Sequence, residues 1–195
     1  MLNILSASAL ESVLKSLIKG LSYELIGRNT GNVMLSHCVV CHSSALIESS
    51  INFKDNGYAV YGANGVVGYS DSYGVAQDSI LIIKDGASVG RVQRASDKYS
   101  VIGTSNYLTA KSHINLDYIF YVLSYFDFSK YVVGSGIPHI YFKDYGCAQI
   151  YCPDIEQQNK IAETLNVITS KINIEISIVE KLREQKQYLL SSLFI

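Results

Sequence analysis

The sequence predicts an α+β fold: one domain with a twisted, mostly antiparallel sheet and flanking helices, followed by a long C-terminal helix that forms a coiled coil. Three observations support this prediction. Residues 31–112 consist of short β-branched and aromatic runs interrupted by Gly, Asn, Asp and Ser, which is typical of strands joined by tight turns. Residues 154–195 contain neither Gly nor Pro, which favours one unbroken helix. Hydrophobic residues make up 48% of the chain and charged residues 17%, so a core can be buried.

The elements follow in order along the chain. The first 21 residues form an apolar stripe at three- and four-residue steps, which predicts an amphipathic helix that Gly20 ends early. The clearest strand runs are Tyr58–Tyr61, Ser79–Lys84 and Ser88–Arg91. An aromatic-rich segment from Asp117 to Phe128 then predicts a short helix packed on the sheet. The N-terminal stripe consists of Leu2, Leu5, Ala9, Val13, Leu17 and Leu21.

The long helix has a clear beginning and a regular apolar seam. Asp154 is a good N-cap, and Gln157 stands three residues later, where it completes a capping box variant. At 1.5 Å per residue the helix extends roughly 60 Å, so we expect it to find a partner outside its own domain. This divides the chain into a domain at 1–152 and a helix at 153–195. The seam steps by 4, 3, 4, 4, 3 and 3 residues, through Ile161, Leu165, Ile168, Ile172, Ile176, Val179 and Leu182.

Charge and composition limit the function. The formal net charge is −1, so no global basic field indicates a nucleic-acid partner. Locally, residues 84–111 carry five basic side chains (Lys84, Arg91, Arg94, Lys98 and Lys111) against Asp85 and Asp97. The N-terminus reads poorly as a signal peptide, and no apolar run approaches the ~20 residues of a membrane span. We therefore expect a cytoplasmic protein with no membrane partner and with reduced cysteines.

Motifs of enzyme chemistry are few. The sequence has no Walker loop, no nucleotide fingerprint, no His-Glu-x-x-His and no Gly-x-Ser-x-Gly, so we predict no catalytic residue and no cofactor. Residues 38–42 do read Cys-x-x-Cys-His, the attachment pattern of c-type haem. That reading requires export, and a zinc site would need Cys147, Cys152 or a histidine in addition. Buried strand thiols, with no metal, are the default interpretation of Cys38 and Cys41.

Four segments carry a resemblance to a known family. They are YAVYGANGVVGY (58–69), ILIIKDGASVGRV (80–92), GSGIPHIYFKDY (134–145) and PDIEQQNKIAETL (153–165), followed by the long helix. In content and order they resemble the specificity subunits of type I restriction-modification systems over about residues 57–195. Residues 1–55 have no counterpart that we can map. Such subunits usually carry two target recognition domains and two antiparallel helices, so this chain resembles half of one.

The resemblance implies a function and partners. It implies a non-catalytic chain that reads one half of a bipartite target in double-stranded DNA and docks methyltransferase (M) subunits, and through them the restriction (R) subunit. One domain with one unpartnered helix also suggests an antiparallel homodimer. The alternative is a non-enzymatic oligomeric adaptor whose domain binds protein or glycan, because a Tyr-rich surface is not diagnostic. Salt-dependent binding to duplex DNA would separate the two readings.

Three groups of residues are candidates for DNA contact, each with a structural alternative. The turn around Asn64 suits an adenine edge but also serves simply to close a hairpin. The two arginines suit guanine or phosphate, or are solvated surface residues. The loop with His139 lies near the recognition face by resemblance, although a lone His is more often structural. The full set is Tyr61, Asn64, Tyr69, Tyr73, Lys84, Arg91, Arg94, Ser135, Gly136 and His139.

Overall fold

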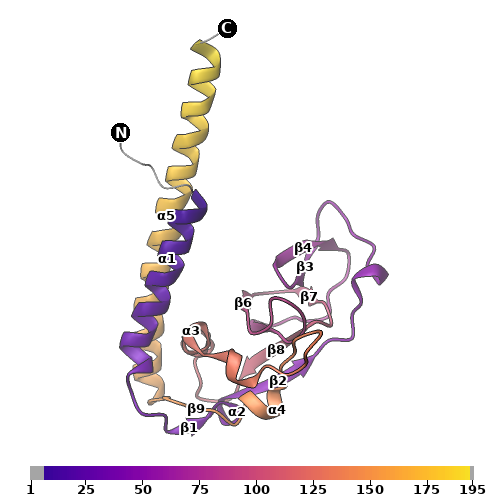
Figure 1. The fold of residues 1–195 in the computed structure, drawn as a ribbon, viewed down its shortest axis with the longest axis vertical. Coiled ribbons are helices and arrows are strands. Elements are labelled where there is room, and N and C mark those ends of the chain that lie inside the picture. The colour runs from indigo at the N-terminus through magenta and orange to yellow at the C-terminus, as the bar shows by residue number, and fades with distance from the viewer. Residues whose placement is uncertain (1–6, 194–195) are drawn as a thin grey trace.

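A computed structural model describes residues 7–193 of the chain. Two helices, α1 (Ala7–Ser22) and α5 (Ile155–Leu193), lie side by side and antiparallel, and an α+β domain projects from one side of the pair (Figure 1). The predicted α+β class with a long C-terminal helix is confirmed. Leu2 and Leu5 of the predicted N-terminal stripe lie outside the described residues.

Three small sheets form the β part of the domain. The central sheet has the order β2-β8-β5-β6 and is antiparallel throughout, and the second has the order β4-β3-β7, with β3 and β7 parallel. A third pairs β1 with β9. Their bounds are β1 Val33–Met34, β2 Val39–Ser43, β3 Tyr58–Gly62, β4 Gly65–Ser70, β5 Ser79–Ile83, β6 Val92–Ala95, β7 Tyr99–Val101, β8 Ser105–Ala110 and β9 Gln149–Ile150.

Short helices connect and cover these sheets. The aromatic-rich helix predicted at 117–128 is α3, which ends at Tyr125 and is followed by a 3-10 turn. Asn115 caps α3, accepting a hydrogen bond from the Tyr118 N–H (2.9 Å). The remaining bounds are η1 Tyr23–Gly27 (a π-helical turn), α2 Leu35–Cys38, η2 Glu48–Ser50, α3 Leu116–Tyr125, η3 Phe128–Tyr131 and α4 Phe142–Tyr145.

Strand β5 of the central sheet packs on both of its faces, and its side chains alternate between the two sides. Ile80 and Ile82 of β5 point into the main core, which α3, α5 and η1 complete. Leu81, between them, points the other way into a smaller core with Ala95 and Tyr99, under the β4-β3-β7 sheet. All five residues of β5 are buried, as expected for a strand packed on both sides.

The long helix begins where the sequence predicts. Asp154 accepts a hydrogen bond from the Gln157 N–H (2.9 Å), which confirms the N-cap. Gln158 is buried and ties this first turn to the domain, donating to the Pro153 carbonyl and accepting from the Asn115 N–H.

The first part of the α5 seam is covered by the chain's own domain, contrary to the expectation that the helix needs a partner outside its domain. Leu165 is fully buried in the main core, and Ile161 packs against that core. Ile168, Ile172, Ile176 and Val179 are half-buried, whereas Leu182 is 58% exposed. The physical reason is α1, which lies along the first part of α5, while α3 packs beside it. Only the C-terminal part of α5 extends past α1 (Figure 1).

Candidate nucleic-acid interface

Three loops meet beside the ends of β3 and β5. They are the β3–β4 turn, the loop from Lys84 to Arg91, and the loop at 133–139. The Gly86 N–H donates to the Pro138 carbonyl, and the Ile140 N–H donates to the Lys84 carbonyl, both at 2.9 Å. Segments some 50 residues apart in the sequence are thereby held together, and we call them the loop cluster.

Arg91 and Asn64 join two of these loops through their side chains. The Arg91 guanidinium donates through Nη1 to Asn64 Oδ1 at 2.7 Å. The Gln93 side chain of β6 donates to the carbonyls of Gly62 and Ala63 at 3.0 and 3.2 Å, and these hydrogen bonds hold the β3–β4 turn against β6. Arg91 is exposed, and within the described part of the chain it has no acidic partner. Since Asn64 Oδ1 is engaged, the groups here that form no hydrogen bond within residues 7–193 are the remaining guanidinium N–H groups of Arg91 and the Asn64 side-chain NH2.

The segment predicted as a strand at Ser88–Arg91 is a tight loop, and β6 begins only at Val92. Gly86 and Gly90 both have positive φ (+91° and +82°), a region that strands do not occupy. A Cβ at Gly90 would lie 2.7 Å from the Cβ of Phe128, so the loop also passes close to η3. The glycines therefore form the turn that presents Arg91, rather than flanking a strand.

The other predicted arginine has a different environment. Arg94 and Val92 share the face of β6 that points to α3, whereas Gln93 lies on the opposite face, toward the β3–β4 turn. Arg94 Nη1 lies 2.6 Å from Asp117 Oδ1, and Nη2 lies 3.6 Å from Asp78 Oδ2. Its charge is therefore compensated within the chain.

The predicted basic patch does not gather at one place. The Lys84 ammonium lies 3.3 Å from an Asp85 carboxylate oxygen. Lys98 stands over the ring of Tyr73, 5.0 Å from its centroid. Lys111 donates to the Ser36 carbonyl at 2.8 Å. Arg91 is the basic residue of this set that the loop cluster presents.

The predicted tyrosines divide into one packing residue and two surface residues. Tyr61 meets Tyr99 edge to face, with 5.5 Å between ring centroids, and so joins the smaller core. Burial, and next to it the neighbouring Tyr69, raises the pKa of the Tyr61 hydroxyl. Tyr69 and Tyr73 are 41% and 42% exposed and remain available for contact.

The loop at 133–139 is pinned at its base and open at its tip. Val133 and His139 exchange two backbone hydrogen bonds of 2.9 Å, and the His139 ring packs edge-on against Tyr141. Ser135 and Gly136 are exposed at the tip. Beside them stand Ile137, 71% exposed, and Tyr141, 47% exposed, neither of which is among the contact residues predicted from the sequence. The only sequence signal for these two was that apolar residues stand within a Gly- and Ser-containing loop.

The Cys-x-x-Cys-His motif lies away from the loop cluster. Cys38 is buried, and a hydrogen bond with Cys152, together with burial, raises the pKa of its thiol. Burial also raises the pKa of Cys41, to about 11. His42 stacks on Tyr107 and hydrogen bonds to Thr109. In residues 7–193 no group of three or more His, Cys, Asp or Glu is placed to hold a metal ion.

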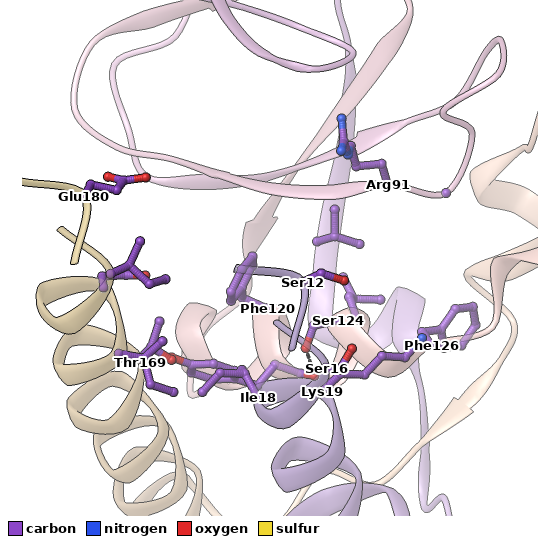
Figure 2. Close-up of a pocket in the computed structure, with 17 residues that line it drawn as sticks. Ser12, Ser16, Ile18, Lys19, Arg91, Phe120, Ser124, Phe126, Thr169 and Glu180 are labelled. Carbon is purple, nitrogen blue, oxygen red and sulfur yellow. Dashed lines mark hydrogen bonds between the residues drawn. The ribbon is translucent and has the colours of Figure 1, made fainter. Parts of the chain in front are cut away.

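An open cleft of about 1000 Å³ lies beside the loop cluster, between α1, α3, α5 and the start of β6. Arg91 stands on the sheet side of this cleft, and Thr169 and Glu180 stand on its α5 side (Figure 2). Lys19 contributes a second basic side chain, from α1. The loop cluster is thus bordered by a groove rather than by a flat surface.

Together these features define a class: a small α+β domain with its polar loops at one rim, carried on a long helix. The family follows from a comparison of sequences. Residues 39–184 match the type I restriction modification DNA specificity domain, and the chain belongs to that family. This match confirms the family that the sequence resemblance indicated. The family is described by DNA specificity and not by a catalytic activity, in agreement with the prediction of a non-enzymatic chain.

Individual relatives agree with this assignment. The chain is 26% identical, over 116 residues, to the type I restriction enzyme EcoprrI specificity subunit of Escherichia coli, and the match covers 60% of this chain and 29% of that protein. Its fold is similar to the S subunit of M. genitalium (TM-score 0.72, 16% identity) and to the HsdS subunit of Thermoanaerobacter tengcongensis (0.61, 16%). The matches cover 92% and 96% of this chain, but only 54% and 52% of those structures. The chain therefore spans about half of each.

No helix in the part of the chain that the structure describes is both long and apolar enough to cross a membrane.

Proposed function

We propose that this chain reads one half of a bipartite DNA target through the loop cluster, as the specificity component of a type I restriction-modification system. One observation carries the placement: Arg91 is held by Asn64 across two loops, exposed and without an acidic partner in the described residues. A guanidinium fixed in this way is suited to the bidentate contact with guanine O6 and N7, or to a phosphate. Asn64, Tyr69, Tyr73, Ser135, Gly136 and His139 form the surrounding candidate surface. Lys84 and Arg94 pair with Asp85 and Asp117. In this proposal they support the DNA-binding surface through these ion pairs and do not contact DNA themselves.

The proposal includes protein partners. Residues 1–152 act as the target recognition domain and residues 153–195 as the docking helix, to which methyltransferase subunits bind and through them the restriction subunit. Two copies of the chain pair antiparallel through α5, which supplies the second half-site. The C-terminal part of α5, which extends past α1 and carries the exposed Leu182, supports this pairing (Figure 1). Light scattering at micromolar concentration should give the mass of two chains, and a strict monomer would contradict the pairing.

The DNA proposal is tested with the chain assembled with its cognate methyltransferase subunit. Bound duplexes are first selected from random-sequence DNA, and the affinity for the selected site is then measured for Arg91→Ala. Losing one bidentate base contact costs about 1–3 kcal/mol, which is roughly a 5- to 150-fold weaker Kd. Asn64→Ala should weaken binding in the same direction, because it removes the group that orients Arg91.

A matched control is available in Arg28. It is equally an exposed arginine, but it pairs with Glu24 (2.8 Å) at the end of η1. Arg28→Ala should therefore leave the affinity unchanged. If Arg91→Ala binds the selected site as tightly as the parent chain, Arg91 is not a contact. If an assembled complex enriches no sequence at all, the adaptor reading replaces DNA recognition.

The salt dependence separates the two kinds of contact that Arg91 can make. A phosphate contact predicts an equal loss on all sequences and a salt slope smaller by about 1. A base contact instead predicts relaxed selection at one position of the target, with the slope retained.

A further inference from the structure

The long helix carries a second apolar stripe, which shares Leu182 with the predicted seam but otherwise lies on another face. Its members share high exposure and are separated by 7, 4, 4 and 7 residues: Val167 (50% exposed), Ile174 (59%), Ile178 (46%), Leu182 (58%) and Leu189 (57%). At 3.6 residues per turn they fall within an arc of about 80°. The seam from Ile161 to Val179 lies roughly 120° away around the helix. We call the exposed set the outer stripe.

The two stripes have different surroundings. The seam faces α1 and α3 of the same chain, and Leu165 on it is completely buried. Among the described residues the outer stripe has no such cover, although it carries five Val, Ile and Leu side chains in a row. A continuous row of exposed aliphatic residues of this length marks a protein contact rather than a solvated surface.

The order of the outer stripe indicates what covers it. Counted from Ile178, its members stand 4 residues away on either side (Ile174 and Leu182) and 11 residues away on either side (Val167 and Leu189). An antiparallel two-fold pair places each residue opposite the one at the same distance beyond the axis. A second copy would therefore set Ile178 against Ile178, Ile174 against Leu182 and Val167 against Leu189. A different partner requires no such symmetry.

The polar positions within the stripe fit the same arrangement. Lys171 and Gln185 stand 7 residues on either side of Ile178, so each lysine meets a glutamine and not another lysine. Like charges opposite each other would oppose pairing, and this register avoids them. The 11-residue spacing of Val167, Ile178 and Leu189 is close to three full turns of a straight helix, so the stripe stays on one face along its length.

We propose that a second copy of this chain docks antiparallel on the outer stripe, with the two-fold axis at Ile178. The inference rests on the proposed pairing through α5 and deepens it, because it moves the contact from the predicted seam to another face of the helix. The seam holds the helix to its own domain, and the outer stripe holds the two copies together. Starting from Ile155, this register sets the beginnings of the two α5 helices about 70 Å apart.

Cysteine cross-linking of the full chain tests the register. Cys147, the exposed native cysteine, is first replaced by Ser. Ile178→Cys should then give a covalent homodimer on mild oxidation, since a residue on the axis meets its own copy. Ile174→Cys and Leu182→Cys should each fail alone, because the like positions lie about 12 Å apart along the axis, beyond the ~7 Å Cα separation that a disulfide spans. Mixed together, these two variants should cross-link.

Ile172→Cys, on the seam of the same helix, is the matched control and should not cross-link. Self-linking of Ile174→Cys as efficient as the mixture would overturn the antiparallel register. A dimer by light scattering without any outer-stripe cross-link would overturn the surface but leave the pairing intact. A monomer without cross-links would overturn both. DNA selection is a separate measurement, so a cross-linked pair that enriches no sequence would contradict DNA recognition and leave this interface standing.

Discussion

Leu165 and Leu182 offer a direct test of how α5 divides its two faces. Both are leucines of the same helix, but Leu165 is fully buried in the core of its own chain and Leu182 is 58% exposed on the outer stripe. Leu165→Ala should therefore destabilise the fold itself. Leu182→Ala should leave the fold of the single chain nearly unchanged and weaken the pairing of copies.

The magnitude follows from the burial. Replacing leucine by alanine removes three carbon atoms, which corresponds to about 2.4 kcal/mol of lost transfer free energy. The cavity left between α3, α5 and the sheet adds to this, since rigid elements surround it, so the unfolding free energy should fall by about 3–4 kcal/mol. For a chain of this size that is a decrease in Tm of roughly 6–16 °C. Leu182→Ala should cost less than about 1 kcal/mol in dilute solution.

The assay is urea unfolding followed by circular dichroism, at a concentration low enough to separate any pairs. Tyrosine fluorescence gives a second probe, since the chain has 15 Tyr and no Trp. Light scattering of the folded variants then measures pairing. If Leu165→Ala keeps the parent urea midpoint but loses the dimer, Leu165 belongs to a seam between chains and the division of faces is refuted.

Two further predictions concern tyrosines and the loop cluster. Burial raises the pKa of Tyr99 and of Tyr125 to about 12, whereas unfolded tyrosine ionises near pH 10. The unfolded state therefore holds fewer protons above about pH 10, so stability present below that pH should fall as the pH rises toward 12. Urea midpoints measured from pH 9 upward should decline, and less steeply for Tyr99→Phe. Gly90→Ala should lower Tm and DNA affinity together, because its φ is +82° and its Cβ would meet Phe128; an unchanged affinity would separate this loop from binding.

Much of the fold was accessible from the sequence because local signals and tertiary structure agree. The Asp154 cap fixes where α5 begins, and the absence of Gly and Pro carries it through to Leu193. The runs predicted at 58–61 and 79–84 are β3 and β5, where β-branched and aromatic residues match half-buried positions in β3 and fully buried positions in β5. The strand predicted at Ser88–Arg91 was wrong because local composition and tertiary structure disagree there. The composition suits a strand, but the positive φ angles of Gly86 and Gly90 do not.

The seam could be recognised as apolar, but its partner could not be identified. The heptad-like steps predict that something covers Ile161 to Val179, and they are equally satisfied by α1 of the same chain or by a second copy. The N-terminal stripe had the same ambiguity. In the structure Ile18 and Leu21 pack on the core, whereas Val13 and Leu17 are 55% and 49% exposed. Which side of an amphipathic helix finds cover depends on tertiary neighbours that periodicity does not encode.

The two arginines show how one boundary decides a functional assignment. Arg91 and Arg94 are three residues apart and look equivalent in the sequence, so both were predicted to contact DNA. Once β6 begins at Val92, strand alternation sends Arg94 toward α3 and Asp117, and leaves Arg91 in the loop beside Asn64. Asp117 in turn accepts a hydrogen bond from Asn166 of α5 (2.9 Å). Arg94 therefore links the recognition sheet to the long helix, and on the proposed function one arginine contacts the target while the other holds the domain against the helix that sets its position.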